Sequence, residues 1–399
     1  MTQDKNVSRR RLLQAVAAAG ATALNGCAGR SLIGGAAAHR VAPNDRVRHL
    51  APLRARTDRI LDITVCLRPF RAAGPRLDTE RIRDTLVVHN YGHGGSGWSL
   101  SWGSSTIAVG KALAQAPDRV AVVGCGALGL TSALLAQAAG KPVTIYARDA
   151  IQQSFSARAS GSFTPDSRIA LASAVSAEFP AQWEAMARTA FKAFRDHLGL
   201  AGDPVRWIDR YSLSDQRTPN ARVPAEGELQ FAAYRSRLQD LFPQGEDLRP
   251  ADTPFRAASV RRRSVLMFNI ASYSQMLMTQ FCLAGGRFEQ REFRDPAEFA
   301  ELPERVVINC TGYGARALWR DDSIVPVRGQ IAHLIPQSEF DYGLDYHDVN
   351  VVPRSDGIVV QAVAGGDMRG YNEDSLAPDR QESEAALRTL AALYSRMRT

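Results

Sequence analysis

The chain has 399 residues and a formal net charge of +8 at pH 7; 45% of its residues are hydrophobic and 23% are charged. This is the composition of an ordinary globular protein, and the length suffices for two domains with a sizeable core. Apart from Arg261–Arg263 the basic residues are dispersed, without interleaved aromatic residues or a zinc-ligand spacing, so we expect no nucleic-acid partner and no metal site.

Residues 1–27 have the layout of a twin-arginine export signal. Three arginines at positions 9–11 precede a small apolar run that ends at Leu24. The run is about 13 residues long, too short to span a bilayer. The sequence LNGC up to Cys27 resembles a bacterial lipoprotein cleavage box, which implies lipidation of Cys27. We therefore expect the twin-arginine export machinery as a partner and a periplasmic or cell-envelope location, with a lipid anchor in a membrane.

Residues 28–45 are rich in Gly and Ala, as in a flexible tether, and the next predicted element is a strand over 57–69. The strand leads to Arg68, and two further arginines follow at Arg71 and Arg76. A guanidinium suits carboxylate recognition because its planar fork donates two parallel hydrogen bonds. Structural ion pairing is the alternative for each arginine, more so for Arg71 and Arg76.

The segment Val88–Ser105 combines many glycines with histidine, asparagine and tryptophan. Glycines at this density let the backbone approach a ligand closely and present several N–H donors to one anionic group. A helix predicted over 104–115 would add the positive end of its dipole. A flexible loop is the alternative, but linkers rarely contain interleaved His and Trp. We interpret the segment as a cofactor cradle, with glycines Gly92, Gly94, Gly95, Gly97 and Gly103.

His89–Gly97, HNYGHGGSG, resembles the flavin-contact motif of D-amino-acid oxidases, and the RPFR sequence at Arg68 is similar to a segment that precedes this motif in that family. The resemblance implies FAD as the cofactor and Arg68 as the partner of the substrate carboxylate. It also implies that a run of residues faces the flavin, namely Gly94, Gly95, Ser96, Gly97, Trp98 and Ser99.

Residues 119–149 contain a dinucleotide-binding fingerprint in its required context. An apolar strand is followed by three spaced glycines, an Ala/Leu-rich helix and a second strand over 142–146. The glycines serve the tight turn, the approach of the pyrophosphate and the packing of the helix on the strand, and the helix N-terminus attracts phosphate. The predicted contacts are Gly124, Gly126, Ala127, Leu128 and Gly129.

The second strand of the fingerprint ends in Arg148 and Asp149, where an acid is expected for the ribose. Arg148 could favour a 2′-phosphate and hence NADP, lie over an adenine ring or be merely solvated, while Asp149 could still reach the ribose. Yeast-type D-amino-acid oxidases have a similar Ala-Arg-Asp tripeptide, so the resemblance favours FAD.

Further segments match the family. Residues 154–165 resemble its loop at the flavin, and Val306–Gly312 matches its second dinucleotide contact. The cofactor contacts implied here are Ser160, Gly161, Phe293 and Gly312. Residues 181–198 are predicted to form an amphipathic packing helix, and residues 378–398 a surface helix.

The predicted substrate strand contains Tyr346 and Asn350. The family carries two tyrosines four residues apart before an apolar-apolar-proline turn, and here Asn350 takes the second position. An amide can still donate a hydrogen bond, but it is shorter and not aromatic. We expect both side chains to line the substrate pocket; plain strand packing is the alternative for Tyr346.

The order of the motifs differs from that of ordinary D-amino-acid oxidases, in which the fingerprint opens the chain and the arginine and glycine segments close it. The resemblance, which covers about residues 57–398, therefore implies a circularly permuted order. Such a rearrangement is tolerable where chain termini lie close together at the surface. The five cysteines show no C-x-x-C spacing, and the four after Cys27 are expected to be free and buried.

We therefore expect an α/β protein with a Rossmann-type FAD-binding domain and a second, mostly antiparallel β-sheet substrate domain. The FAD-binding domain is predicted at 86–165 and 286–335, and the substrate domain at 46–85, 166–285 and 336–370.

The expected function is oxidation of the Cα–N bond of a D-amino acid or related amine by hydride transfer to flavin N5. The imino acid formed would hydrolyse to a 2-oxo acid, with oxygen as acceptor and H2O2 as product. The alternatives are a membrane-anchored dehydrogenase that passes electrons to a quinone or cytochrome, and a flavin-binding lipoprotein without catalytic activity.

Overall fold

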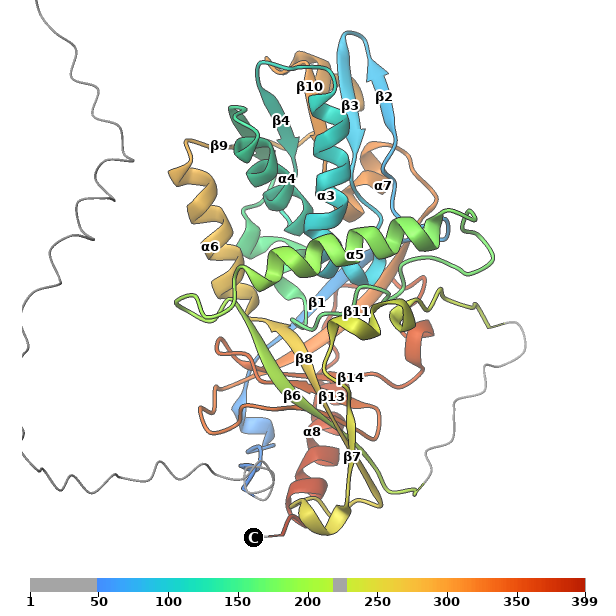
Figure 1. Ribbon diagram of the computed structural model, residues 1–399, viewed down its shortest axis with the longest axis vertical. Helices are drawn as coiled ribbons and strands as arrows, with labels where there is room; N and C mark the ends of the chain where they lie inside the picture. The colour runs from blue at the N-terminus through green and yellow to red at the C-terminus, as the bar shows by residue number, and fades with distance from the viewer. Residues whose placement is uncertain (1–48, 218–227, 399) are drawn as a thin grey trace, which may run out of the picture. The chain divides into compact units, whose positions relative to one another are not determined.

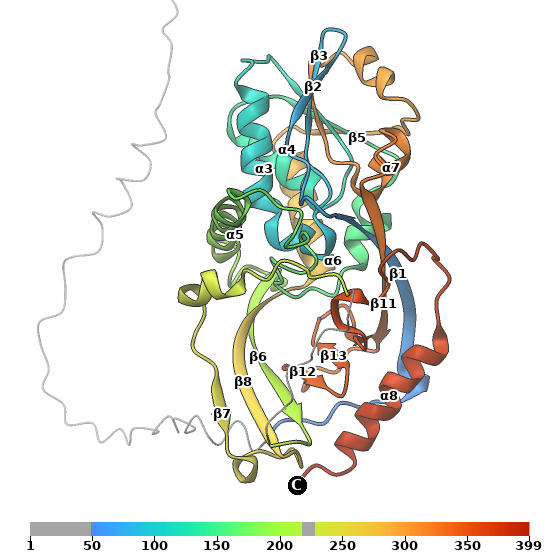
Figure 2. The same cartoon turned by 90° about the vertical axis from the view of Figure 1, so that its right-hand side faces the viewer.

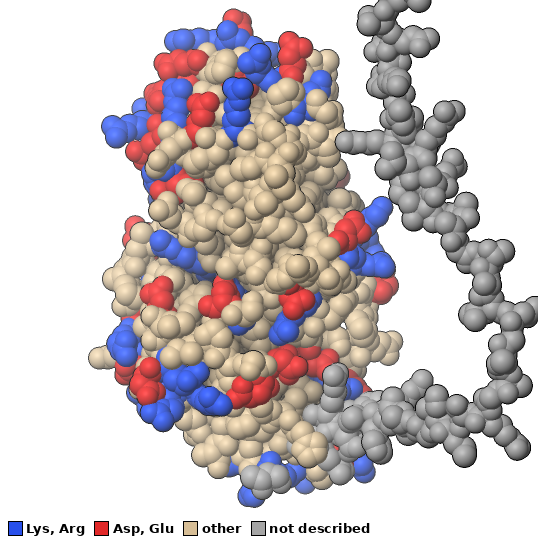
Figure 3. All heavy atoms as spheres, turned by 90° about the vertical axis from the view of Figure 1, so that its left-hand side faces the viewer, with Lys and Arg blue, Asp and Glu red and all other residues tan. Residues whose placement is uncertain are grey.

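The computed structural model describes residues 49–217 and 228–398. The predicted export signal, Cys27 and the predicted tether lie outside these residues. Within the described part of the chain, no helix is both long and apolar enough to cross a membrane. On the face seen in Figure 3, acidic and basic side chains lie in mixed groups separated by uncharged areas.

The strands of the described residues form two sheets, one of six strands and one of eight. The six-stranded sheet is parallel except for one edge strand (Figure 1). Its central strands are apolar along nearly their whole length because helices and loops bury both faces. In spatial order its strands are β2 (Thr79–Ile82), β3 (Thr85–His89), β10 (Val306–Asn309), β4 (Val120–Val123), β5 (Val143–Ala147) and β9 (Arg287–Gln290).

Three helices, α3 (Gly97–Leu113), α4 (Ala127–Ala138) and α6 (Ile270–Leu283), pack on one face of this sheet (Figure 1). The short helix α7 (Ala315–Leu318) and a 3-10 turn at Pro296–Glu301 cover the other face.

Helix α3 begins at Gly97, seven residues before the predicted start at 104. Burial of Trp98 and Leu100 outweighs the cost of the glycines in the helix. Its Gly103 is required by packing, because a Cβ there would lie 2.0 Å from the carbonyl oxygen of Met186 on the crossing helix α5 (Phe179–Arg195).

The eight-stranded sheet is antiparallel except where β12 runs parallel to β6. The sheet is curved, and helix α8 (Arg380–Tyr394) packs on the outer face of the curve (Figure 2). In spatial order its strands are β1 (Ile60–Arg71), β11 (Ile324–Leu334), β14 (Ile358–Ala362), β13 (Val349–Val352), β12 (Gly343–Tyr346), β6 (Val205–Ser214), β8 (Ser259–Phe268) and β7 (Glu246–Leu248).

These sheets confirm the predicted fold class, a mixed α/β protein with a Rossmann-type sheet and a mostly antiparallel sheet. They do not follow the predicted domain boundaries everywhere. Strand β2 lies in the six-stranded sheet because it forms a hairpin with β3, and β11 lies in the eight-stranded sheet because it pairs with β1. The division into domains itself stays a prediction.

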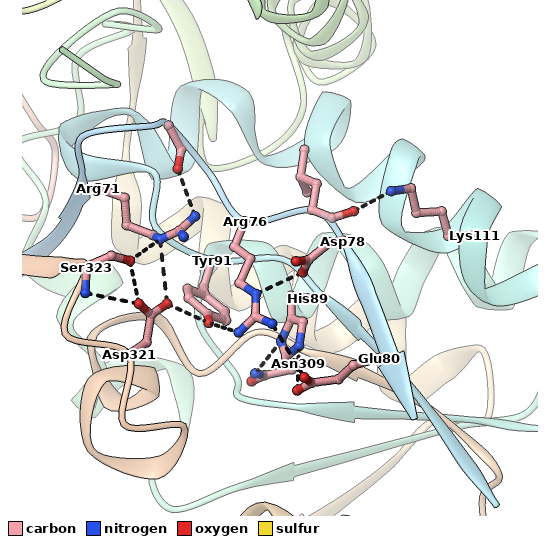
Figure 4. A network of polar contacts seen from close by, with 12 residues as sticks. Arg71, Arg76, Asp78, Glu80, His89, Tyr91, Lys111, Asn309, Asp321 and Ser323 are labelled. Carbon is pink, nitrogen blue, oxygen red and sulfur yellow. Dashed lines mark hydrogen bonds and ion pairs between the residues drawn. The ribbon is translucent and has the colours of Figure 1, made fainter. Parts of the chain in front are cut away.

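A polar network holds the early part of the chain against its late part (Figure 4). Arg71 Nε donates to Ser323 Oγ at 2.8 Å and lies 3.5 Å from a carboxylate oxygen of Asp321. The hydroxyl of Tyr91 donates to the same carboxylate at 2.9 Å and accepts from Arg76 Nη1 at 2.9 Å. Arg71 and Arg76 therefore serve in structural ion pairs, with Asp321 and Asp78, which is the alternative to carboxylate recognition.

Of the four cysteines in the described part of the chain, Cys66, Cys125 and Cys310 are buried and free, as expected. Burial raises the pKa of both the Cys125 and the Cys310 thiol to about 12, so neither is reactive at neutral pH. Cys282 is also free but exposed, contrary to the expectation, because it lies on the solvent side of α6.

We predict opposite effects of the same substitution at two glycines of α3. Gly103→Ala should lower the free energy of unfolding by about 1–3 kcal/mol, because the new methyl group meets backbone of α5. Gly110→Ala should raise it by about 0.5–1 kcal/mol, because nothing lies within 4 Å and alanine favours the helix. Urea unfolding of both variants measures the difference; equal effects would contradict the packing argument.

Candidate functional site

A cavity of about 1930 Å3 is lined by residues of both sheets. The pockets of drug-sized ligands occupy roughly 300–1,000 Å3, so this cavity suits a larger cofactor together with a substrate. It lies at the carboxyl ends of β4, β5 and β10. The chain passes from β9 at one edge to β10 on the opposite side of β4, which makes this the switch point at which open α/β sheets bind dinucleotides.

The turn between β4 and α4 depends on its glycines. Gly124 has φ +107°, and a Cβ there would lie 2.4 Å from the carbonyl oxygen of Cys310. A Cβ at Gly129 would lie 1.9 Å from the carbonyl oxygen of Gly124, so this glycine permits the helix to pack on the turn and does not itself line the cavity. At Gly126 the nearest atom is only the hydroxyl of Ser156, and the backbone faces the cavity.

The N-terminus of α4 faces the cavity, because its first residues, Ala127 and Leu128, line it. The first turn of α4 carries no acidic residue. Its positive end therefore suits a pyrophosphate. Ser156 connects this helix to α3: its hydroxyl accepts from Ala127 N–H at 3.1 Å, and its carbonyl accepts from Trp98 Nε1 at 2.8 Å. Sequence reasoning missed Ser156, since a serine in a short 3-10 helix carries no distinguishing signal.

The glycine segment packs against the backbone of Ser167 and Arg168. Gly94 has φ +53°, and a Cβ there would lie 1.9 Å from the carbonyl oxygen of Arg168; the N–H of Gly95 donates to the carbonyl of Ser167 at 2.9 Å. Ser96 differs from the prediction, because its buried hydroxyl donates to the same carbonyl and does not line the cavity. The segment's other predicted contacts do line it, namely Gly94, Gly95, Gly97, Trp98 and Ser99.

His93 lines the cavity with its side chain only 1% exposed, and neither ring nitrogen has a hydrogen-bond partner among the described residues. Buried polar groups are nearly always paired, so an unpaired imidazole at a cavity wall points to a polar ligand there. Burial lowers the pKa of His93 to about 3, which keeps the ring neutral at physiological pH.

The remaining predicted cofactor contacts also line the cavity, namely Arg148, Asp149, Ser160, Gly161, Phe293 and Gly312. Arg148 Nε donates to Asp149 Oδ2 at 2.8 Å, and Arg148 Nη1 lies 3.8 Å from Glu292. Two carboxylates therefore surround this guanidinium, which disfavours the 2′-phosphate of NADP.

Arg68 reaches the cavity from β1, and its guanidinium has no hydrogen bond or ion pair with any described residue, although its backbone is part of the ladder with β11. Its guanidinium lies over Gly329 of the paired strand, where a Cβ would be 2.3 Å from Nη2. Arg168 is nearby, and burial together with the charge of Arg68 lowers the pKa of Arg168 to about 10. Arg68 is thus a cation without an ion-pair partner among the described residues, beside a second cation, Arg168, whose Nε lies 3.9 Å from Asp367 Oδ1.

Tyr346 does not line the cavity, contrary to the prediction. His347 and Asp348, with φ of +42° and +59°, form a two-residue turn between β12 and β13, so that Tyr346 pairs with Val349 and Asp345 pairs with Asn350. The turn therefore puts Tyr346 and Asn350 on opposite faces of the sheet.

The side chain of Tyr346 packs in the hydrophobic cluster under α8, and its hydroxyl donates to Asp215 at 2.8 Å. Asn350 does line the cavity, as expected, where its amide donates to Asp345 Oδ1 at 2.6 Å.

Charged residues of the cavity wall were missed by the sequence reasoning. Arg210 donates to Asp345 Oδ1 at 3.0 Å and to Ser162 Oγ at 3.1 Å, and Arg263 lies opposite Arg210 on the neighbouring strand. Alternation along a strand could have indicated that Arg263 and Arg262 face opposite sides, but not which of them faces a cavity. Within the described part of the chain, no three His, Cys, Asp or Glu side chains form a group able to hold a metal ion.

Comparison with known proteins defines the class. Residues 119–398 match the family model DAO, FAD dependent oxidoreductase. A D-amino-acid oxidase of Rubrobacter xylanophilus is 31% identical over 291 residues, which cover 70% of this chain and 78% of that protein. A D-amino-acid oxidase of Dictyostelium discoideum is 26% identical over 282 residues, 69% of this chain and 72% of that protein.

Among solved structures, glycine oxidase from Geobacillus kaustophilus aligns with a TM-score of 0.43 at 14% identity, over 71% of this chain and 95% of that chain. The family match and the 31% identical relative define the class as FAD-dependent oxidoreductases. The chain belongs to the DAO family, which confirms the predicted enzyme class and the predicted cofactor.

The residues present fit FAD. The glycine turn and the N-terminus of α4 could hold the pyrophosphate, and Asp149 could accept from the ribose. The flavin could lie between the residues of the glycine segment and the loop at Ser160 and Gly161, beside the unpaired ring of His93.

We predict that Gly126→Val yields folded, colourless protein. The nearest atom to the new side chain is the flexible hydroxyl of Ser156 at 2.8 Å, so the fold should survive while the valine blocks the pyrophosphate. Visible absorbance measures bound FAD and circular dichroism measures the fold. Ala138→Val, at the exposed end of the same helix, is the control and should stay yellow. Recovery of NADP from the wild type, or full FAD in Gly126→Val, would contradict the assignment.

Proposed function

We propose that this enzyme oxidises the Cα–N bond of a D-amino acid. The substrate loses a hydride from Cα and a proton from nitrogen, and water converts the resulting imino acid to a 2-oxo acid and ammonia. FAD, when bound, supplies the hydride acceptor, and oxygen reoxidises it with formation of H2O2. The similarity to proteins described as D-amino-acid oxidases supports both the substrate class and the acceptor.

The unpaired guanidinium of Arg68 is the observation that carries this proposal. It lies in the cavity without a carboxylate partner among the described residues, and the neighbouring Arg168 adds a second positive charge. Arg168 donates to the carbonyls of Asp367 and Gly366 at 2.7 and 2.8 Å, so these bonds fix its position. A substrate carboxylate would neutralise Arg68 through two parallel hydrogen bonds.

Other residues would orient the substrate and stabilise charge. Asn350, held by Asp345, lines the pocket. The N-terminus of α3 begins in the glycine segment, and its free N–H groups would stabilise negative charge on a bound flavin. Among the described residues that line the cavity, His93 is the only histidine, and its lowered pKa makes it a poor base. We therefore propose that the amine binds in its neutral form.

We predict that Arg68→Ala lowers kcat/KM for D-amino acids by roughly 30-fold to 1000-fold, because it removes about 2–4 kcal/mol of transition-state binding. FAD content should stay unchanged. Arg59→Ala, at a partly buried arginine that lies just before the same strand and does not line the cavity, is the control and should keep wild-type kinetics. Full turnover by Arg68→Ala, or loss of FAD from it, would show that the residue is structural.

Two competing functions are distinguished by the same assays. Anaerobic bleaching of the flavin by D-amino acids separates an enzyme from a flavin-binding lipoprotein. A stoichiometric yield of peroxide in air separates an oxidase from a dehydrogenase that uses a quinone or cytochrome.

We also propose that the family's segment order is circularly permuted in this chain. Support comes from the family match, which begins at residue 119, and from the pairing of the earlier strands β1 and β3 with the late strands β11 and β10. The residues between 57 and 118 would thus take the place of the family's last segments.

The export signal is proposed from the sequence alone, on Arg9, Arg10 and Cys27. We predict that replacement of both arginines by lysine retains the protein in the cytoplasm, because twin-arginine export requires the pair. Cys27→Ala should abolish labelling with a radioactive fatty acid. Cell fractionation measures the first effect, and export that persists in the lysine variant would remove the claim.

A further inference from the structure

Two arginines face each other across neighbouring strands at the cavity wall. Arg210 on β6 and Arg263 on β8 are directly paired in the antiparallel ladder, and both line the cavity. Like charges directly opposite each other destabilise a sheet. Arg235, which also lines the cavity, adds a third positive charge. This arrangement requires negative charge nearby.

The chain itself supplies only part of that charge. Asp345 lies 3.0 Å from Arg210 Nη1 and 3.9 Å from Arg263 Nη2. Its two oxygens already accept from Asn350 at 2.6 Å and from Ser212 at 3.2 Å, in addition to Arg210. One carboxylate, which already accepts three hydrogen bonds, thus serves two guanidinium groups. Arg235 has Asp166 at 3.6 Å as its own ion-pair partner.

Arg263 retains unused hydrogen-bond donors. Its Nε is buried without a partner, and the one hydrogen bond described for its guanidinium goes to Ser212 Oγ at 3.3 Å. The side chain is still 40% exposed, toward the cavity that it lines. Burial is the main cause of a lowered pKa at Arg263, and the positive charges of Arg235 and Arg210 contribute to it.

The pair lies beside the proposed reaction centre. Arg210 Nη2 donates to the hydroxyl of Ser162, the residue after Gly161 in the loop assigned to the flavin. Arg68 reaches the same cavity from β1, which lies at one edge of the curved eight-stranded sheet, whereas β6 and β8 lie toward the opposite edge (Figure 2). The cavity therefore has two separate sites able to bind a carboxylate.

We propose that Arg210 and Arg263 bind the side-chain carboxylate of an acidic D-amino acid while Arg68 binds its α-carboxylate. This inference rests on the proposed function. A dicarboxylic substrate supplies the missing negative charge between the two paired strands, and each guanidinium can donate two hydrogen bonds to it. A neutral side chain would leave the two cations with the carboxylate of Asp345 as their one shared partner.

Carboxylates that bind without being oxidised test the second site independently of turnover. Calorimetric titration of the FAD-loaded enzyme with succinate and with butyrate, which has the same number of carbon atoms and one carboxylate, should show roughly 10- to 100-fold tighter binding of succinate. Arg263→Gln should abolish this preference, and Arg263→Lys should retain part of it.

The control is Arg261→Gln, which removes the same charge two residues away on β8, from an exposed ion pair with Asp247 outside the cavity. It should keep the preference for succinate. Equal binding of succinate and butyrate by the wild type, or an equal loss of preference in the Arg261 and Arg263 variants, would overturn the inference.

Turnover tests the substrate class. The kcat/KM for D-glutamate and D-aspartate should exceed that for D-glutamine and D-asparagine by about 10- to 100-fold, and Arg263→Gln should lower only the values for the acids. Oxidation of D-amino acids without this preference would reject the acidic substrate class and leave the proposed function standing. Preferential binding of succinate without oxidation of any D-amino acid would reject the proposed function and leave the second anion site standing.

Discussion

The pairing of the early strands β1 and β3 with the late strands β11 and β10 is the constraint on which the site depends. Arg71 and Ser323, which hydrogen-bond to each other, are 252 residues apart in the sequence, and His89 and Asn309 are 220 residues apart. Strand β1 positions Arg68, and β3 leads directly into the glycine segment. Without these pairings, neither the candidate carboxylate partner nor the glycine segment would meet the dinucleotide fingerprint.

The buried His89 shows how this junction is kept rigid. Its Nε2 lies 3.0 Å from Glu80 Oε1 and its Nδ1 lies 3.1 Å from the amide nitrogen of Asn309, so a neutral ring that donates to Glu80 and accepts from Asn309 satisfies all three groups (Figure 4). Burial, assisted by Arg76, lowers the pKa of His89 to about 4 and favours this neutral form. The junction therefore joins the β2–β3 hairpin to the distant strand β10 through side chains that hydrogen-bond to one another.

Sequence reasoning succeeded where function is encoded locally. The β4–α4–β5 unit with its glycines, and the glycine segment before α3, were predicted because their spacing follows from backbone geometry within about 30 residues. Sequence reasoning failed where it had to decide which face of a strand a side chain lies on. Tyr346 and Asn350 were placed together, but a two-residue turn between them reverses the alternation. The wall formed by Arg210 and Arg263 depends on a strand register that no local pattern specifies.

The position of β1 in the chain affects how the protein folds during its synthesis on the ribosome. Within the described residues, the strand that pairs with β1 is β11, and the ladder joins Arg71 to Ile324. At about 5–20 residues per second, the ribosome needs roughly 13–50 s to synthesise the intervening residues, and β1 exposes an unpaired edge throughout that time. The segment carrying Arg68 thus leaves the ribosome well before the strand that fixes its position, and the open edge of β1 is a site for aggregation until β11 has been made.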